Sequence, residues 1–356
     1  MAETSTIIFY FSIFLLATIN AAIAEISRHS WIEFIFRLLC FTVIWIPAAI
    51  RYDIGTDYPV YVQWFDNDEF DATEAGLYLI FNLVKYFDGN AQWAFAVVAF
   101  LTYFPICFGM PKKGYTLIIL FFLLIIYISS YNIIRHDLAI CIITFAFVRF
   151  MINSNSKKYF ILFVLLATLI HTSSILCLIF AFIRPIKSAR MLILTAVSLI
   201  AITLIVDVPA AIFNNSLFLE SRYGDYASNK FGEATVLGSG LGVMIQMLIP
   251  TLMIVKSKAL LEADEKYTYL IMANIFFICS TILSSQIYIF GRLATLFTFA
   301  PAIALGMTYS HLGQLRKLIT AALIALYIAY FYVATFINGA ETNGVFPYQT
   351  FFGLVI

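Results

Sequence analysis

Residues 31–61 read WIEFIFRLLCFTVIWIPAAIRYDIGTDYPVY, and their character changes in the middle. Up to Ile50 the run is apolar and long enough to cross a membrane, since a span needs about 20 such residues. From Arg51 onward, charged and aromatic residues crowd together. Gly55 and Pro59 favour irregular backbone over a continuing helix there. Such a segment either caps a helix or builds a site at the membrane surface.

The composition of the whole chain indicates a membrane protein. Of 356 residues, 62% are hydrophobic and 12% are charged, whereas about a quarter of a soluble domain is charged. No basic tail or nucleic-acid patch is present, so we expect no nucleic acid as a partner. The N-terminus lacks the basic region and cleavage site of a signal peptide, so its apolar run is expected to remain as a span. These features predict an all-α, polytopic integral membrane protein with a single transmembrane domain over residues 1–356.

Ten apolar runs predict about ten transmembrane helices. They cover residues 6–24, 31–50, 91–110, 115–134, 137–152, 190–208, 236–255, 267–284, 290–310 and 318–337. Residues 158–183 are too long for one span and too short for two, and basic residues stand at both ends. They predict a re-entrant or broken helical hairpin with His171 at its bend. Residues 76–87 are amphipathic and too short to span, which predicts a short interfacial helix.

The distribution of basic residues predicts the orientation. Fifteen of the 21 lysines and arginines fall on one side of the predicted spans, and this side is expected to be cytoplasmic. Both termini then face outward, to the periplasm or the cell exterior. The long outer connections lie at about 51–90, 209–235 and 338–350. The six basic residues on the outer side are Arg51, Lys85, Arg135, Arg222, Lys230 and Arg292.

Residue patterns of several common active sites are missing from the sequence. All five cysteines lie in apolar runs and are interpreted as small core residues. No cluster of His, Cys, Asp and Glu has metal-ligand spacing. There is no phosphate-binding glycine loop and no nucleophile elbow. We therefore expect neither a metal nor a cofactor.

The outer arginines are candidates for anion binding. Arg135 stands where two apolar runs meet with almost no loop, and Arg292 is similarly placed. An arginine at membrane depth costs about 2.5–3.5 kcal/mol on insertion scales, so each needs a reason to be there. A guanidinium binds phosphate or carboxylate through two parallel hydrogen bonds. The alternatives are a snorkelling side chain or, for Arg135, an ion pair with Asp137.

His171 is the candidate proton acceptor. A lone histidine with apolar neighbours is more often a hydrogen-bonded core residue than a catalyst. At a helix break that faces outward, however, it can take a proton from an incoming hydroxyl. Thr172, Ser173 and Ser174 can satisfy the backbone groups that such a break frees. His136 and Asp137 are interpreted as residues that orient Arg135.

Four segments, taken in order, point to a known family. They are Arg-x-x-x-Gly-Thr-Asp-Tyr at 51–58, Glu-Ala-Gly-Leu-Tyr at 74–78, Ile-Arg-His-Asp-Leu-Ala at 134–139 and Ala-Thr-Leu-Ile-His-Thr-Ser-Ser at 167–174. Together they resemble the EpsG/Wzy-like family of polysaccharide repeat-unit polymerases, with His136 where that family usually has glutamine. Arg222-Tyr223, Tyr226 and Pro347-Tyr348 fit more weakly. The resemblance covers about residues 45–350.

The resemblance implies a glycosyltransferase that uses no nucleotide sugar. Such proteins join oligosaccharide repeat units carried on undecaprenyl pyrophosphate at the outer face of the bacterial plasma (inner) membrane. The growing chain moves from its lipid pyrophosphate to a sugar hydroxyl of the next unit. Its partners would be the lipid-linked oligosaccharide and membrane lipid, with a chain-length regulator and a flippase as further candidates. O-antigen, capsule and exopolysaccharide pathways fit equally.

Roles for individual residues follow from this chemistry. The base for the acceptor hydroxyl would be His171 or Asp57. The expected pyrophosphate ligands are Arg51, Arg135, Arg292 and, ranked below them, Arg222. Arg51 and Arg135 join His171 and Asp57 in the expected catalytic set. Outer residues suited to sugar binding are Asp53, Tyr58, Tyr61 and Tyr223.

Other functions fit parts of the sequence. A flippase or other transporter for lipid-linked oligosaccharide also needs arginines, but along a path that reaches the cytoplasmic side. A membrane acyltransferase or ligase acting on the same lipid-linked glycan also uses a histidine within apolar helices, so His171 alone does not separate it from a polymerase. A structural partner of an export complex has no need for four outer arginines.

Overall fold

The computed structural model describes residues 2–68, 74–153, 156–206, 240–287, 290–338 and 344–356. These residues are almost entirely helical and contain no β-strand, only two isolated bridges. Contacts divide the chain into two compact units. The first consists of Met1–Phe182, Leu305–Met307 and Tyr327–Ile356, and the second of Ile183–Ala304 and Thr308–Leu326.

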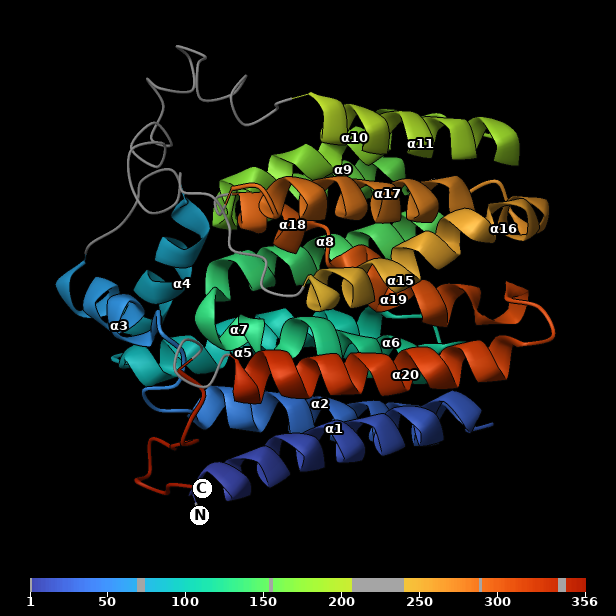
Figure 1. Ribbon diagram of the computed structural model, residues 1–356. Helices are drawn as coiled ribbons and strands as arrows, with labels where there is room; N and C mark the ends of the chain where they lie inside the picture. Colours follow the sequence, from blue (N-terminus) through green and yellow to red (C-terminus); the bar gives the residue numbers. More distant parts are fainter. Residues whose placement is uncertain (1, 69–73, 154–155, 207–239, 288–289, 339–343) are drawn as a thin grey trace, which may run out of the picture. The chain divides into compact units, whose positions relative to one another are not determined.

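The first unit contains the N-terminal helices, and its long helices α1, α2, α5 and α8 lie side by side (Figure 1). Its elements are α1 (Ala2–Ile26), α2 (Ser30–Ile50), α3 (Tyr58–Asn67), α4 (Ala75–Tyr86), α5 (Ala91–Gly109), α6 (Tyr115–Phe122), the π-helix η1 (Leu123–Tyr127), α7 (Ser129–Asn132), α8 (Ile134–Ile152), α9 (Lys157–Ile170), the 3₁₀-helix η2 (Thr172–Leu178), α10 (Ile179–Phe182) and the π-helix η6 (Val333–Ile337).

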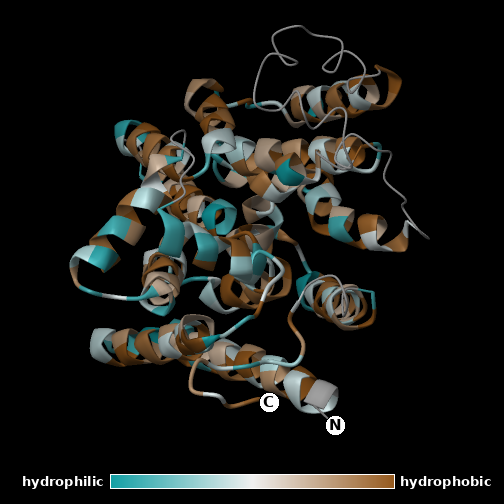
Figure 2. Cartoon of the chain, turned by 90° about the vertical axis from the view of Figure 1, so that its left-hand side faces the viewer, coloured by the Kyte–Doolittle hydropathy of each residue, from teal (hydrophilic) through white to brown (hydrophobic). Residues whose placement is uncertain are grey.

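The second unit contains α11 (Ala189–Ile205), α15 (Leu241–Val255), α16 (Ser257–Ala263), α17 (Tyr267–Ser284), α18 (Gly291–Leu296) and the 3₁₀-helix η5 (Tyr309–His311). Residues of α19 (Phe299–Thr308) and α20 (Arg316–Tyr332) belong to both units. Apolar residues cover most of the long helices (Figure 2), as the composition predicts.

The prediction of about ten spans is not supported. Six helices of the described residues are long and apolar enough to cross a membrane, or seven if the bent pair α15 and α16 forms one span. Three predicted runs fall short for different reasons. The run 115–134 divides into α6, η1 and α7, and α11 has only 17 residues. The run 137–152 lies in α8, where three charged side chains, Arg135, Asp137 and Arg149, interrupt the apolar surface that a span needs.

The hairpin predicted over residues 158–183 is present in the structure. Helix α9 ends at Ile170, and His171 has extended backbone (φ −146°, ψ 113°). The chain then continues as η2 and α10. Lys157, at the start of α9, lies 5.5 Å from the ring of Phe182, at the end of α10. The two ends of the segment therefore lie close together, and His171 lies at the bend between its two arms.

Helix α4 confirms the helix predicted at residues 76–87. Leu77 and Phe81 on one face are buried, whereas Leu79 and Leu83 on the other are 62% and 56% exposed. This two-sided pattern is typical of a helix that covers a protein core with one face and meets lipid or water with the other.

Hydrogen bonds complete the C-terminal end of α2. The last four carbonyls of a helix have no partner within it and must find one elsewhere. Here Pro47 accepts from the Tyr348 hydroxyl (2.6 Å), Ala48 from Arg51 Nη1 (2.7 Å) and Ile50 from a backbone N–H of the C-terminal segment. The carbonyl of Ala49 accepts from a glutamine amide of α5. Arg51 thus caps the helix, and its positive charge suits the negative end of the helix dipole.

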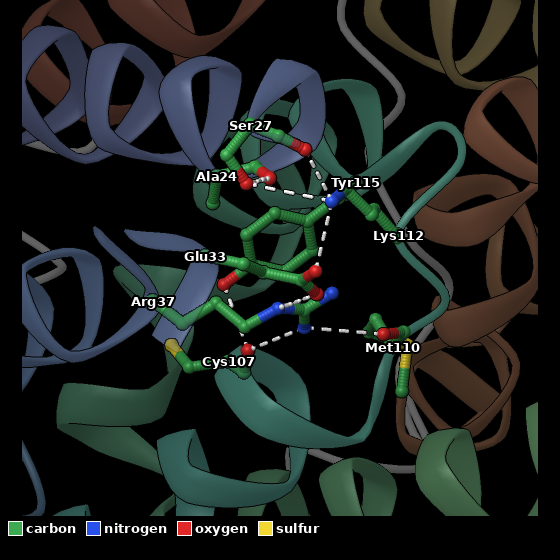
Figure 3. Close-up of polar contacts among 8 residues, drawn as sticks. All are labelled: Ala24, Ser27, Glu33, Arg37, Cys107, Met110, Lys112 and Tyr115. Carbon is green, nitrogen blue, oxygen red and sulfur yellow. Dashed lines mark hydrogen bonds and ion pairs between the residues drawn. The ribbon is translucent and has the colours of Figure 1, made fainter. Parts of the chain in front are cut away.

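The opposite end of α2 is tied to its neighbours through Arg37, which is 6% exposed (Figure 3). Its Nε pairs with Glu33 Oε1 at 3.0 Å, and its Nη1 donates to the carbonyls of Cys107 (2.9 Å) and Met110 (3.1 Å). The guanidinium lies 4.1 Å from the ring centroid of Tyr115. Arg37 therefore stabilises the C-terminal end of α5 and joins it to α2 and α6.

Arg37→Met is expected to destabilise the protein by about 1–3 kcal/mol, because the buried Met110 carbonyl loses the Arg37 donor, whereas Glu33 keeps its ion pair with Lys112. The measurement is thermal unfolding of the purified protein in detergent. Arg28→Met is the matched control, since Arg28 is exposed near the same end of α2. Equal unfolding midpoints for the two variants would contradict this role of Arg37.

Candidate functional site

The polar segment after α2 is held in place by α7 and the C-terminal segment. Gly55 has φ 102°, and a Cβ there would lie 2.4 Å from the carbonyl oxygen of Tyr131, so only glycine fits. The N–H of Gly55 donates to Gly344 O (2.8 Å), and that of Thr56 donates to Asn132 Oδ1 (2.6 Å). These contacts fix the point at which α3 begins.

Helix α3 presents two aromatic side chains to Arg135. Pro59 in the first turn suits a helix start, because its missing N–H would have no partner there. Tyr61 and Trp64 are three residues apart and therefore lie on the same face of α3. The Arg135 guanidinium lies 4.7 Å from the Trp64 ring and 6.0 Å from that of Tyr61. The cation thus rests against an aromatic surface.

The Tyr61 side chain is buried beside Arg135. Burial raises the pKa of Tyr61 above its ordinary value, although the charge of Arg135 acts in the opposite direction. The hydroxyl therefore stays protonated at neutral pH. Asp57 immediately precedes α3 and is half-exposed.

Glu74 is the centre of the site. One carboxylate oxygen, Oε2, binds Arg135 Nη1, and the other, Oε1, lies 3.1 Å from Nδ1 of His171. The backbone N–H of Thr172 donates to Oε1 at 3.4 Å. The Glu74 side chain is 4% exposed and that of His171 is 11% exposed, whereas that of Arg135 is 23% exposed. The site is therefore buried at the histidine and open at the arginine.

The environment of Glu74 keeps its carboxylate ionised. Burial acts to raise the pKa of Glu74, but the hydrogen bond with His171 and the charge of Arg135 outweigh burial and lower it to about 2. At neutral pH the site therefore holds a negative charge between the guanidinium of Arg135 and the imidazole of His171.

Close packing of α4 against α9 brings Glu74 to the bend at His171. A Cβ at Gly76 would lie 2.6 Å from Cγ1 of Ile170 and 3.0 Å from the carbonyl oxygen of Leu169. Only glycine allows the start of α4 to come this near to the end of α9. The spacing Glu74-x-Gly76 thus combines the central carboxylate of the site with the small residue that positions it.

Two side-chain contacts predicted from the sequence, one with Arg135 and one at the bend, are not made. The pairing of Arg135 with Asp137 is wrong, because the Asp137 carboxylate is fully buried and accepts from Ser129 Oγ at 2.6 Å. His136 stacks on His171, with ring centroids 4.5 Å apart. Ser173 and Ser174 do not use their hydroxyls at the bend, since neither hydroxyl has a hydrogen-bond partner there.

The structure brings together only part of the predicted site. Arg51 is 2% exposed and lies against the rings of Phe95 and Tyr131 at 5.2 and 4.9 Å. Tyr58 is buried, stacks on Phe95 at 4.6 Å and donates to Gln92. Asp53 is exposed in the loop, with φ 51°. Arg292 lies in α18 of the second unit, and Arg222 and Tyr223 fall outside the described residues.

The whole chain, which carries Arg51, Glu74, Arg135 and His171 in this order, can now be compared with known proteins. Residues 34–350 match the EpsG family. The chain belongs to this family. No curated protein and no solved structure matches it. Membership of this Wzy-like polysaccharide polymerase family indicates a glycosyltransferase-like polymerase that works as a multi-pass membrane protein.

Three residues of the site in this EpsG-family chain had no predicted catalytic or binding role. Glu74 belongs to an outer acidic loop and to the family-like segment 74–78, but its chemistry alone does not distinguish it from the other acidic residues of that loop. Trp64 could have been found from its helical spacing with Tyr61. His136 was expected only to orient Arg135, because contact with His171 depends on how α8 and α9 pack.

Proposed function

We propose that this protein joins oligosaccharide repeat units carried on undecaprenyl pyrophosphate, at the outer face of the bacterial plasma membrane. The observation that supports this most is the meeting of Arg135 and His171 at Glu74 in a chain of the EpsG family. A pyrophosphate leaving group needs a fixed cation, and an acceptor hydroxyl needs a base. The site supplies both from two segments that are distant in sequence.

The proposed reaction is a single glycosyl transfer. The acceptor hydroxyl of the incoming unit gives its proton to Nε2 of His171 while its oxygen bonds to the anomeric carbon of the growing chain. The bond between that carbon and the pyrophosphate oxygen breaks. Undecaprenyl pyrophosphate leaves with the bonding electron pair, and Arg135 stabilises the negative charge. The proton that His171 has accepted is later released to water.

Two further features fit a glycan substrate. Trp64 is half-buried beside Arg135, and its ring suits the apolar face of a sugar, whereas Tyr61 is buried and supports Arg135. The half-exposed Asp57, at the start of α3, is the alternative base. Arg292 and Arg222 are further candidate pyrophosphate ligands, and Asp53 and Tyr223 further candidate sugar ligands. Arg51 and Tyr58 are buried, and we assign them to support of the loop.

The test is reconstitution of the purified protein in liposomes with a lipid-linked repeat unit. A polymerase is expected to yield a ladder of chain lengths with release of undecaprenyl pyrophosphate. Movement of the unit across the bilayer without a ladder would identify a flippase. Transfer of the glycan to a different acceptor would identify a ligase, and transfer of an acyl group an acyltransferase.

The predicted orientation of the chain in the membrane can be tested separately. The excess of basic residues on one side predicts that Asp66 lies outside and Lys258 inside. A membrane-impermeant thiol reagent applied to intact cells is expected to label Asp66→Cys and to miss Lys258→Cys, in a background without the five native cysteines. A cysteine at position 225, in the outer connection 209–235, should also react, and one at position 112 should not. Labelling of position 258 from outside would refute this orientation.

A further inference from the structure

Glu74 holds the two proposed reactive groups in one arrangement. Its two carboxylate oxygens bind different partners, Oε2 the guanidinium of Arg135 and Oε1 the Nδ1 of His171. The carboxylate is buried, so neither bond is weakened much by bulk water. A carboxylate accepts hydrogen bonds only, so its contact with His171 requires a proton on Nδ1. The neutral imidazole then carries its lone pair on Nε2.

The bond with Arg135 has a different consequence. With no ligand bound, Glu74 neutralises the arginine. A pyrophosphate that approaches the exposed edge of Arg135 meets the same guanidinium from the other side and is repelled by the carboxylate. Glu74 therefore weakens anion binding while it prepares the base. These two effects of one side chain have opposite signs, which distinguishes them from simple support of the fold.

We propose that Glu74 is a positioning residue that sets the tautomer of His171 and restrains Arg135 until an anionic donor competes for it. This inference rests on the proposed function, because it assigns Glu74 its role through the base and the pyrophosphate ligand of that reaction. Pairing of Arg135 with pyrophosphate frees Oε2, while Oε1 keeps its bond to His171. Glu74 therefore still orients the imidazole of His171 when the donor pyrophosphate is bound to Arg135.

Glu74→Gln is expected to slow polymerisation while it tightens pyrophosphate binding. The loss in kcat should be about 10- to 100-fold, as when a carboxylate that orients a metal-bound histidine is removed. Inorganic pyrophosphate, used as a competitive inhibitor, should bind about fivefold more tightly, the change that a partly exposed ion pair is worth. Both values are measured with the purified full-length protein in liposomes. A residue that only supports the fold would weaken binding and slow the reaction together.

Three further variants make the test decisive. Asp66→Asn, an exposed acid of the same outer region, should change neither value. Glu74→Asp keeps the charge but is too short to reach both partners, so its kcat should fall between those of the parent and Glu74→Gln. In a protein that already carries His171→Ala, Glu74→Gln should cause no further loss of rate, because it acts through His171.

The outcomes separate this inference from the proposed function. A parent that forms ladders, with Glu74→Gln equal to it in kcat, would overturn the role of Glu74 and leave the polymerase intact. Weaker pyrophosphate binding in Glu74→Gln, or a further loss of rate in the double variant, would also overturn it. A parent that forms no ladder would overturn the proposed function itself.

Discussion

Replacing His171 by alanine is expected to lower the rate of chain extension by about 100- to 10,000-fold, the loss typical when a general base is removed. The histidine ends α9 at the bend of the hairpin, and Glu74 fixes its ring at 3.1 Å. Alanine removes the imidazole, which is the proposed proton acceptor. The measurement is the initial rate of polymer formation in membranes matched for the amount of protein, and the product should stay at one repeat unit.

Two comparisons decide whether His171 is the base. His29→Ala is the matched control, because His29 is an exposed histidine between α1 and α2, and it should polymerise at the parent rate. Asp57→Asn tests the alternative. Near-parent activity in His171→Ala with no activity in Asp57→Asn would assign the base to Asp57. If both are inactive but still bind the lipid-linked unit, the pH–rate profile of each variant identifies the residue that takes the proton.

The class of fold was predictable because it depends on composition and on the length of apolar runs. These quantities need no tertiary contacts. The hairpin was predictable for a related reason, since a run of 26 residues between basic ends fits neither one span nor two. The number of spans was not predictable, because it depends on where helices break. The π-helix η1 divides one predicted span, and nothing in Leu-Leu-Ile-Ile-Tyr marks that change.

The site was predictable only in part. Arg135 and His171 stand out in the sequence because a cation or an imidazole is costly among apolar residues. Glu74 does not stand out, because a carboxylate in a polar loop is ordinary. Its role arises only when Gly76 lets α4 pack against α9. Arg51 shows the reverse case, because its position after an apolar run suggests both a cap and a site. In the structure its guanidinium donates a hydrogen bond to the carbonyl of Ala48, so Arg51 caps α2.

Arg135→Ala is expected to reduce polymerisation by about 100- to 1,000-fold, the range found when one preorganised donor to a developing negative charge is removed. Its side chain is 23% exposed and already oriented by Glu74, Tyr61 and Trp64. It can therefore meet the leaving pyrophosphate with little rearrangement. Arg135→Lys should recover only a small part of the rate, because an ammonium lacks the planar fork that binds a phosphate through two parallel hydrogen bonds.

The contrast with Arg51 makes this prediction specific. Arg51 donates to Ala48 and lies between two aromatic rings, so Arg51→Ala should lower the thermal midpoint and the amount of folded protein. Arg135→Ala should lower both less, because the buried Glu74 carboxylate keeps its hydrogen bonds with His171 and the backbone N–H of Thr172. Arg28→Ala, an exposed arginine near the opposite end of α2, should alter neither stability nor rate. If Arg135→Ala gives full ladders at a normal protein level, Arg135 has no role in the reaction. Arg292 is then the next candidate pyrophosphate ligand.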